Sequence, residues 1–424
     1  MIFKIIFLLV LFVTFQFCKP KKKDDNNNNL LMGAILLSNK TPKDKAIDEY
    51  NSRYLGTTVV NSGWTGSVTG CNPGSTSKEA NDKTLARINY FRAQVGLTAV
   101  SFDSNTDIYT QSAALMMKAN NTLDHNPPNT WTCYTSAGAT GAAKSNLAGV
   151  AKGMHSSPAI TVYMQDEGTW NYAVGHRRWI LYSKLLTIGS GNTDTTNALW
   201  VVGDFASSYP SNMPEFIAWP PKGFVMRQLV FPRWSFSVPD ANFTNATITI
   251  QVPDGSAVSL TKETYAVGYG DNTVVWVPTG INTSSTQDQK YKVNIGNVVV
   301  GAETKSYSYE VEIIDPGENG PATTVPNIDW SSNAFIIPNQ VEGQKFIYNC
   351  PPGGNPDVVF GVDIYATNSS VCTAAVHAGK ISLSVGGTVT FIIRKSLTNY
   401  SGSTRNGITS YDLSSWIYGS FVFQ

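Results

Sequence analysis

Apolar residues recur at helical spacing between residues 77 and 166. Within residues 77–95 the apolar positions fall on one face of a predicted helix, and Gly96 ends it. These positions are Leu85, Ile88, Phe91 and Val95. A second helix is predicted over residues 107–120, and a third begins at Ser157-Pro158 and runs towards residue 166. Residues 198–202 are typical of a buried strand, so the pattern predicts a layered α+β domain.

The pattern changes near residue 212, where short alternating runs replace helical spacing. Strands are predicted over residues 247–252, 273–277, 291–295 and 307–314. Turn sequences such as Pro253-Asp254-Gly255 separate them. Strands at this spacing favour an immunoglobulin-like sandwich, which we interpret as a spacer or binding module. A linker rich in Gly and Pro follows, and the last hundred residues are again rich in strands and small residues.

The N-terminus has the pattern of an export signal. Lys4 precedes the apolar residues 5–17, a run too short for a permanent membrane span, and Cys18 follows at once. This arrangement resembles the lipidated cysteine of bacterial lipoproteins, although Phe15 and Phe17 replace the usual small residues. Ordinary secretion with nearby cleavage is the alternative. Residues 19–29 form a polar tether, and the apolar run 30–37 either rests on a membrane or packs on the protein.

The composition indicates an extracellular compartment and argues against a nucleic-acid partner. The chain has 424 residues, enough for about three domains, and 14% of them are charged, below the usual quarter. This favours a β-rich extracellular protein. A formal net charge of +1 provides no overall field that attracts nucleic acid, so we expect no nucleic-acid partner.

The five cysteines fit an oxidising compartment. If Cys18 is acylated, four remain, which suits two disulfides. Cys71 and Cys133 flank the first folded region, while Cys350 and Cys372 lie in the last. Pairing within each region is the economical interpretation, so we expect Cys71–Cys133 and Cys350–Cys372.

The candidate chemistry lies in residues 163–181, which read YMQDEGTWNYAVGHRRWIL. Asp166 and Glu167 precede His176 by about ten residues. Carboxylates and an imidazole are the usual components of a metal site or a general-base pair. The chain has four histidines, and His125, on a loop before two prolines, is the expected partner of His176. A structural role for either histidine is the alternative. For His377, in the apolar run AAVHAG, helix packing is the preferred interpretation.

Several motifs in this region resemble the CAP superfamily, the cysteine-rich secretory, antigen 5 and pathogenesis-related proteins. In order they are LARINYFR at 85–92, AALMM at 113–117, HNPP at 125–128, SNLA at 145–148 and GHRRW at 175–179. Among the branches of the family, these motifs most resemble those of the bacterial branch. The resemblance implies an α-β-α sandwich with a central cleft, and a role in lipid or sterol carriage.

The resemblance also implies a cleft of two histidines and two acidic residues. His125 and His176 match the histidines, and Asp166 matches one acid, with adjacent Glu167 as the alternative. Ser145, beside Asn146, stands where the family has its second carboxylate. We expect His125, His176 and Asp166 to hold zinc or another divalent metal, with Glu167, Ser145 and Asn146 in the cleft.

The final region resembles an LCCL domain. The motifs include NCPPG at 349–353, SSVCTAAVHAG at 369–379 and NGITS at 406–410. Cys350 and Cys372 match two of the family's four cysteines, but Gly354 occupies the position of the usual partner of Cys372. We favour a Cys350–Cys372 bridge over two free thiols. The resemblance implies binding of lipid or of a glycolipid similar to lipopolysaccharide.

These observations predict an α+β protein with six segments. They are a signal peptide with a lipidated cysteine at 1–18, a tether and linker at 19–70, a CAP domain at 71–212, an immunoglobulin-like β-sandwich at 213–316, a linker at 317–327 and an LCCL domain at 328–424.

The predicted function is that of an exported binding protein, anchored at the bacterial outer membrane or secreted, with a lipid, glycolipid or glycan ligand. A metal-dependent hydrolase or protease and a structural adhesin are the alternatives. The missing second acid and the lack of GxSxG or HExxH sequences weigh against hydrolysis.

Overall fold

The computed structural model describes residues 40–149, 154–325, 328–337 and 340–424. The predicted signal peptide, Cys18, the tether at 19–29 and the apolar run 30–37 lie outside these residues. The chain divides into two units, Met1–Lys45 and Ala46–Gln424, and the second contains every domain discussed below. None of the helices in the described part of the chain combines the length and apolarity needed to span a bilayer.

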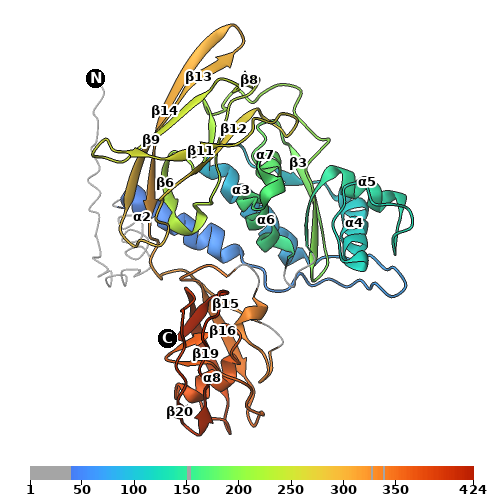
Figure 1. The fold of residues 1–424 in the computed structure, drawn as a ribbon. Helices are drawn as coiled ribbons and strands as arrows, with labels where there is room; N and C mark the ends of the chain where they lie inside the picture. The colour runs from blue at the N-terminus through green and yellow to red at the C-terminus, as the bar shows by residue number, and fades with distance from the viewer. Residues whose placement is uncertain (1–39, 150–153, 326–327, 338–339) are drawn as a thin grey trace, which may run out of the picture. The chain divides into compact units, whose positions relative to one another are not determined.

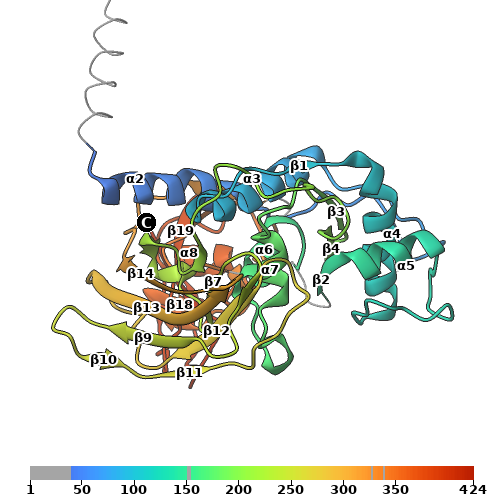
Figure 2. The ribbon, with the colours of Figure 1, turned by 90° about the horizontal axis from the view of Figure 1, so that it is seen from above.

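The first domain has three layers, α-β-α (Figures 1 and 2). Its sheet has the strand order β1-β3-β4-β2, with β1 parallel to β3 and the other pairs antiparallel. Helices α4 and α5 lie on one side of the sheet, and α3, α6 and α7 lie on the other. The bounds are α3 Lys78–Gln94, α4 Asp107–Asn120, α5 Ser136–Lys144, α6 Ser156–Gln165, α7 Gly175–Ile180, β1 Ser101–Phe102, β2 Ser145–Gly149, β3 Thr187–Asn192 and β4 Thr196–Trp200.

The three predicted helices are confirmed. The hydroxyl of Ser77 accepts a hydrogen bond from the N–H of Ala80 and caps α3, and Gly96, at φ +76°, follows its end. The predicted strand at 198–202 is displaced, because β4 ends at Trp200. The amides of Val201 and Val202 instead donate to the carbonyl of Lys144 at the end of α5.

The middle domain consists of two sheets, and all four predicted strands are confirmed. One sheet has the order β10-β9-β13-β14-β6, with β8 also pairing with β13; the other has the order β11-β12-β7-β5. Strands β13 and β14 form a long hairpin (Figure 1). The bounds are β5 Ile217–Trp219, β6 Gly223–Met226, β7 Trp234–Ser237, β8 Ala241–Asn242, β9 Thr247–Gln251, β10 Ala257–Val258, β11 Leu260–Lys262, β12 Thr273–Pro278, β13 Gln289–Val300 and β14 Glu303–Ile314.

One hydrophobic core runs through the first and middle domains, from Tyr50 to Ile314. The rings of Phe91 on α3 and Trp219 on β5 meet edge to face, with centroids 5.2 Å apart. Such aromatic contacts add stability beyond the area they bury. The middle domain is therefore part of the support of the first domain, in addition to any spacer role.

The C-terminal domain has its own core. Its sheet has the order β15-β16-β19-β22-β18-β17, accompanied by helix α8 and the hairpin β20–β21. The bounds are β15 Ala322–Thr324, β16 Lys345–Cys350, β17 Gly361–Val362, β18 Ile364–Ala366, α8 Val371–His377, β19 Gly387–Arg394, β20 Thr404–Arg405, β21 Ile408–Thr409 and β22 Ser420–Phe423. His377 is fully buried, and its ring contacts the hydroxyl of Tyr365 at 2.9 Å, which confirms its packing role.

Short helical elements connect these domains and precede the first one. They are α2 Pro42–Glu49, η1 Tyr50–Tyr54, η2 Leu55–Thr57, η3 Ser104–Thr106, η4 Thr169–Asn171, η5 Arg227–Leu229 and η6 Ala334–Ile336. The described elements as a whole confirm an α+β protein.

Candidate functional site

Asp166 turns the chain at the end of α6. It adopts the left-handed conformation, φ 53°, which aspartate tolerates better than most residues. Its side chain is buried, and Oδ2 accepts the backbone N–H groups of His176, at 2.9 Å, and Arg177, at 3.3 Å. The carboxylate thereby satisfies amides at the start of α7 that have no partner within the helix.

The same carboxylate holds the imidazole of His176. Nδ1 of His176 lies 2.7 Å from Oδ1 of Asp166, and because the carboxylate accepts, Nδ1 carries the proton and Nε2 keeps a lone pair. The ring stacks on Tyr163 with centroids 5.5 Å apart. The side-chain amide of Asn146 donates to the carbonyl of His176 at 3.0 Å, so both ring and backbone are fixed.

The imidazole of His125 is held in the same way. Its Nδ1 lies 2.9 Å from the carbonyl oxygen of Ala142 on α5, which can only accept, so Nε2 again keeps its lone pair. The loop before α5 is held by the disulfide Cys71–Cys133, and by the carboxylate of Asp124, which accepts the N–H of Asn126.

Both histidines line one cavity of about 590 Å³. Asp166 and Glu167 also line it, together with apolar side chains and a few amides. The apolar lining residues include Leu123, Leu147, Met154 and Val162. The structure therefore brings together four of the predicted cleft residues. Glu167 is exposed, and its carboxylate accepts a hydrogen bond from the amide of Gln165 at 2.6 Å.

Ser145 and Asn146 differ from the prediction that they face the cleft. Both are buried in β2, and neither is among the residues that line the cavity. The hydroxyl of Ser145 has no hydrogen-bond partner among the described residues, whereas Asn146 acts on the site through the carbonyl of His176. Successive side chains of a strand point to opposite faces of the sheet, and helices cover both faces here, so both residues are buried.

The predicted three-ligand set of His125, His176 and Asp166 is not assembled. Among the described residues, no group of three His, Cys, Asp or Glu side chains is placed to hold a metal ion. Asp166 is engaged by Nδ1 of His176 and by two backbone amides, so it orients this histidine.

Both predicted disulfides, Cys71–Cys133 and Cys350–Cys372, are present. Gly354 stands where the LCCL family has a cysteine, and this difference has a steric reason. A Cβ atom at this position would lie 1.7 Å from the indole ring of Trp330, so the tryptophan occupies the space that a cysteine side chain would need.

Two site residues that the sequence analysis did not assign are the arginines after His176. Arg177 is buried and donates to the carbonyls of Met164 and Gln165 on α6 and of Arg233 in the middle domain, at 2.6–3.2 Å. Arg178 donates to the carbonyls of Ala266 and Asp271, both at 3.0 Å. Burial lowers the pKa of each arginine to about 10. The sequence feature that could have identified these two residues is an arginine pair directly before an apolar run.

The middle domain also reaches the site directly. Arg233 forms an ion pair with Glu263 at 2.9 Å and donates to the backbone carbonyl of Asp166 at 3.2 Å. The backbone of Asp166 is therefore held by a residue of the middle domain that directly precedes β7.

Comparison with known families agrees with this architecture. The model of the cysteine-rich secretory protein family, CAP, matches residues 85–205, and the LCCL domain model matches residues 328–420. The chain contains a CAP domain and an LCCL domain. Together with the two disulfides, these domains indicate an exported protein of extracellular type.

Several curated proteins are similar over part of the chain. Vitrin from Bos taurus is 42% identical over 100 residues, which cover 23% of this chain and 14% of vitrin. Cochlin from Cavia porcellus is 48% identical over 23% of this chain and 18% of cochlin. Human "Cysteine-rich secretory protein LCCL domain-containing 2" is 49% identical over 55 residues, 13% of this chain and 11% of that protein. The chain thus spans less than a fifth of these relatives.

The solved structure of the periplasmic chaperone SfaE is 12% identical and covers 43% of this chain and 88% of its own, with a TM-score of 0.16. A score this low carries no argument about the fold.

Proposed function

We propose that this protein is an exported binding protein whose CAP cavity holds a divalent metal through His125 and His176. The observation that supports the proposal is that both imidazoles are held by a hydrogen bond at Nδ1. Each has Nδ1 committed to an oxygen acceptor, Asp166 or the Ala142 carbonyl, and each lines the same cavity. Histidines that bind metal usually have their second ring nitrogen held in this way.

The two imidazoles would supply two of the three protein ligands that zinc has in its open sites. Two neutral imidazoles would supply nitrogen ligands, with the remaining positions left to ligand or solvent oxygen atoms. A bound divalent ion would supply Lewis acidity that attracts and polarises an oxygen of the ligand. The protein's own contribution is to fix both rings, through Asp166 and Ala142, before any ligand arrives.

The rest of the cavity favours an apolar ligand with a polar end. Leu123, Leu147, Met154 and Val162 form the apolar part of the lining, and the two histidines with Glu167 provide the polar part. A lipid whose oxygen-bearing end meets the metal has this distribution of polarity. Binding is favoured over hydrolysis because Ser145, at the position of the family's second acid, lies outside the cavity lining.

We further infer that the protein is a bacterial lipoprotein of the outer membrane. The support is the sequence itself, in which Cys18 follows an apolar signal and precedes a hydrophilic tether. Stable retention needs more than one acyl chain, which lipoprotein maturation supplies at one cysteine. We also infer that the LCCL domain contacts lipid or glycolipid at that surface, by analogy with its family.

Calorimetric titration of zinc into the full chain tests the metal proposal. We expect His125→Ala and His176→Ala to weaken binding by at least about tenfold each, since each removes one of two nitrogen ligands. His377→Gln is the control, because this histidine is buried in the separate core of the C-terminal domain. Equal zinc affinity in wild type and both cavity variants would refute the proposal.

A further inference from the structure

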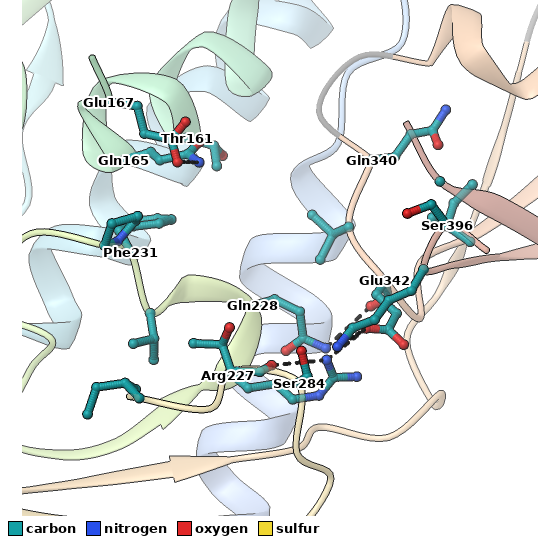
Figure 3. Close-up of a pocket in the computed structure, with 18 of the residues that line it drawn as sticks. Thr161, Gln165, Glu167, Arg227, Gln228, Phe231, Ser284, Gln340, Glu342 and Ser396 are labelled. Carbon is teal, nitrogen blue, oxygen red and sulfur yellow. Dashed lines mark hydrogen bonds and ion pairs between the residues drawn. The ribbon is translucent and has the colours of Figure 1, made fainter. Parts of the chain in front are cut away.

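A second and larger cavity, of about 920 Å³, lies where the CAP, middle and LCCL domains meet (Figure 3). Residues of α6 and the turn after it form one wall, the stretch from η5 to β7 and the loop after β12 form another, and the LCCL domain forms the third. This volume is near the upper end of the range for small-molecule sites, so a ligand larger than a single ring fits.

The cations that line this cavity are each paired with a carboxylate, and the other lining carboxylate, Glu167, accepts a hydrogen bond from the amide of Gln165. Arg227, 7% exposed at its side chain, binds Asp315 at 3.0 Å and Glu342 at 2.8 Å. Arg394 binds Glu318 at 2.7 Å, and Lys395 lies 3.8 Å from Glu342. These pairs neutralise the cations that face the cavity. The lining therefore favours a ligand without net charge.

Hydrogen-bonding capacity remains in the glutamine amides. Gln165, Gln228 and Gln340 all line the cavity, and the hydroxyls of Ser284 and Ser396 lie among them (Figure 3). Oε1 of Gln228 and Oε1 of Gln340 are buried and accept no hydrogen bond from any residue that the structure describes. The amide nitrogen of Gln228 donates to the carbonyl of Glu342 at 3.3 Å, and that of Gln340 donates to the carbonyl of Ala334.

An unpaired amide oxygen is a costly group to bury, of the order of 1–3 kcal/mol, and is satisfied only by a donor. The terminal torsion of glutamine is broad, so a small rotation turns Oε1 towards a ligand. An acyl chain brings no donor and would leave both oxygens unpaired. A ligand rich in hydroxyl groups would satisfy both.

An aromatic cluster extends the cavity to the surface. Tyr418 lines the cavity and is 55% exposed, and the centroid of its ring lies 5.1 Å from those of Phe335 and Trp416. The indole N–H of Trp416 donates to the hydroxyl of Thr367 at 2.8 Å, which fixes the cluster in place. Phe231 also lines the cavity, but it is buried and its ring stacks on that of Trp219.

We propose that this cavity binds a neutral oligosaccharide. A sugar ring presents C–H groups on its faces and hydroxyl groups around its edge. The faces suit Tyr418 and the aromatic cluster around it, and the hydroxyls suit the oxygens of Gln228 and Gln340. Gln165 and Glu167 line both this cavity and the histidine cavity, so the two cavities adjoin, but the proposed ligand does not depend on a bound metal.

Saturation-transfer NMR and calorimetry on the full chain provide the test, with maltohexaose, cellohexaose and chitohexaose as probes. We expect one of them to bind, and we expect Gln228→Met, Gln340→Met and Tyr418→Ala each to weaken that binding by about tenfold. Methionine keeps the length of glutamine and removes its amide.

Gln94→Met, on α3 outside the cavity, is the matched control and should leave oligosaccharide affinity unchanged. Circular dichroism confirms that each variant is folded. The proposal is overturned if none of the three oligosaccharides binds at millimolar concentration, if the cavity variants bind as well as wild type, or if phosphatidylcholine vesicles compete with the sugar for the cavity.

Discussion

Oδ1 of Asp166 lies 2.7 Å from Nδ1 of His176, and the other oxygen of the same carboxylate accepts the backbone N–H of that histidine. One acid therefore sets the position of the α7 backbone, the orientation of the ring and the ring nitrogen that carries the proton. Both oxygens of this side chain accept hydrogen bonds from the segment that begins α7, so its role in the site is to orient the histidine.

Asp166→Asn should weaken zinc binding by about 10–100-fold, the usual effect of removing such a partner. The amide keeps the size of the carboxylate but can accept at only one of its two atoms. Calorimetry measures the affinity, and nitrogen NMR of His176 reports which ring nitrogen is protonated. Asp363→Asn is a matched control, since Asp363 also has positive φ but lies on the LCCL domain. An unchanged affinity and tautomer in Asp166→Asn would contradict the assigned role.

Arg177→Met should destabilise the protein by roughly 3 kcal/mol or more. The substitution leaves the carbonyls of Met164, Gln165 and Arg233 without their donor, and each buried unpaired group costs about 1–3 kcal/mol. Urea unfolding measures the change. Arg405→Met removes an exposed pair with Asp363 and should change stability by less than about 1 kcal/mol. Equal effects of the two substitutions would show that the buried arginine does not join the domains.

Stability should fall between pH 7 and pH 4 because of His155. Burial lowers the pKa of this histidine to about 4, and Asp194 opposes that shift only in part. The unfolded chain has the ordinary pKa near 6.5, so below that pH it binds a proton that the folded state does not.

Through this group the free energy of unfolding should decrease as pH falls from about 6.5 to about 4, by up to about 3 kcal/mol. Urea unfolding at pH 7, 6, 5 and 4 measures this free energy. His155→Gln should flatten the dependence over this window, and a variant with the slope of wild type would exclude His155 as its source.

Replacing both Cys71 and Cys133 by serine should cost roughly 4 kcal/mol. The bridge joins residues 62 positions apart, and in the chain-entropy model a loop of that length gives about this stabilisation. Peptide mapping without reductant checks the pairing first. His125 lies close to Cys133 in sequence, so zinc affinity should fall as well. Free thiols at either position in wild type would refute the bridge.

Cys18→Ala should move the protein from the detergent-extracted membrane fraction to the soluble fraction. The acyl chains at Cys18 would be the anchor, and the polar residues 19–29 would hold the domains away from the surface. Metabolic labelling with a fatty acid and fractionation provide the measurement. An unlabelled wild type together with a variant that stays in the membrane would refute lipidation; a labelled wild type whose variant stays bound would point to residues 30–37 as a second contact.

The sequence alone determined the features that local chemistry controls. Ser77 and Gly96 bound α3 because a hydroxyl cap and a left-handed glycine act within a few residues of the helix ends. Strand alternation placed β9, β12, β13 and β14, and counting cysteines by region gave both disulfides. His125 and His176 were identified by their motifs, and the structure places them in one cavity.

Only the tertiary structure decided what each polar group contacts. Whether Asp166 faces a metal or a histidine depends on α7 returning to the end of α6, ten residues later. The burial of Ser145 depends on the helices that cover β2. Arg177 and Arg178 look like surface charges in sequence, yet their partners are carbonyls from distant segments. The sequence pattern indicates which residues can be buried. Their hydrogen-bond partners come from segments that meet only when the core forms. The roles of the polar residues in the site could therefore not be predicted from the sequence.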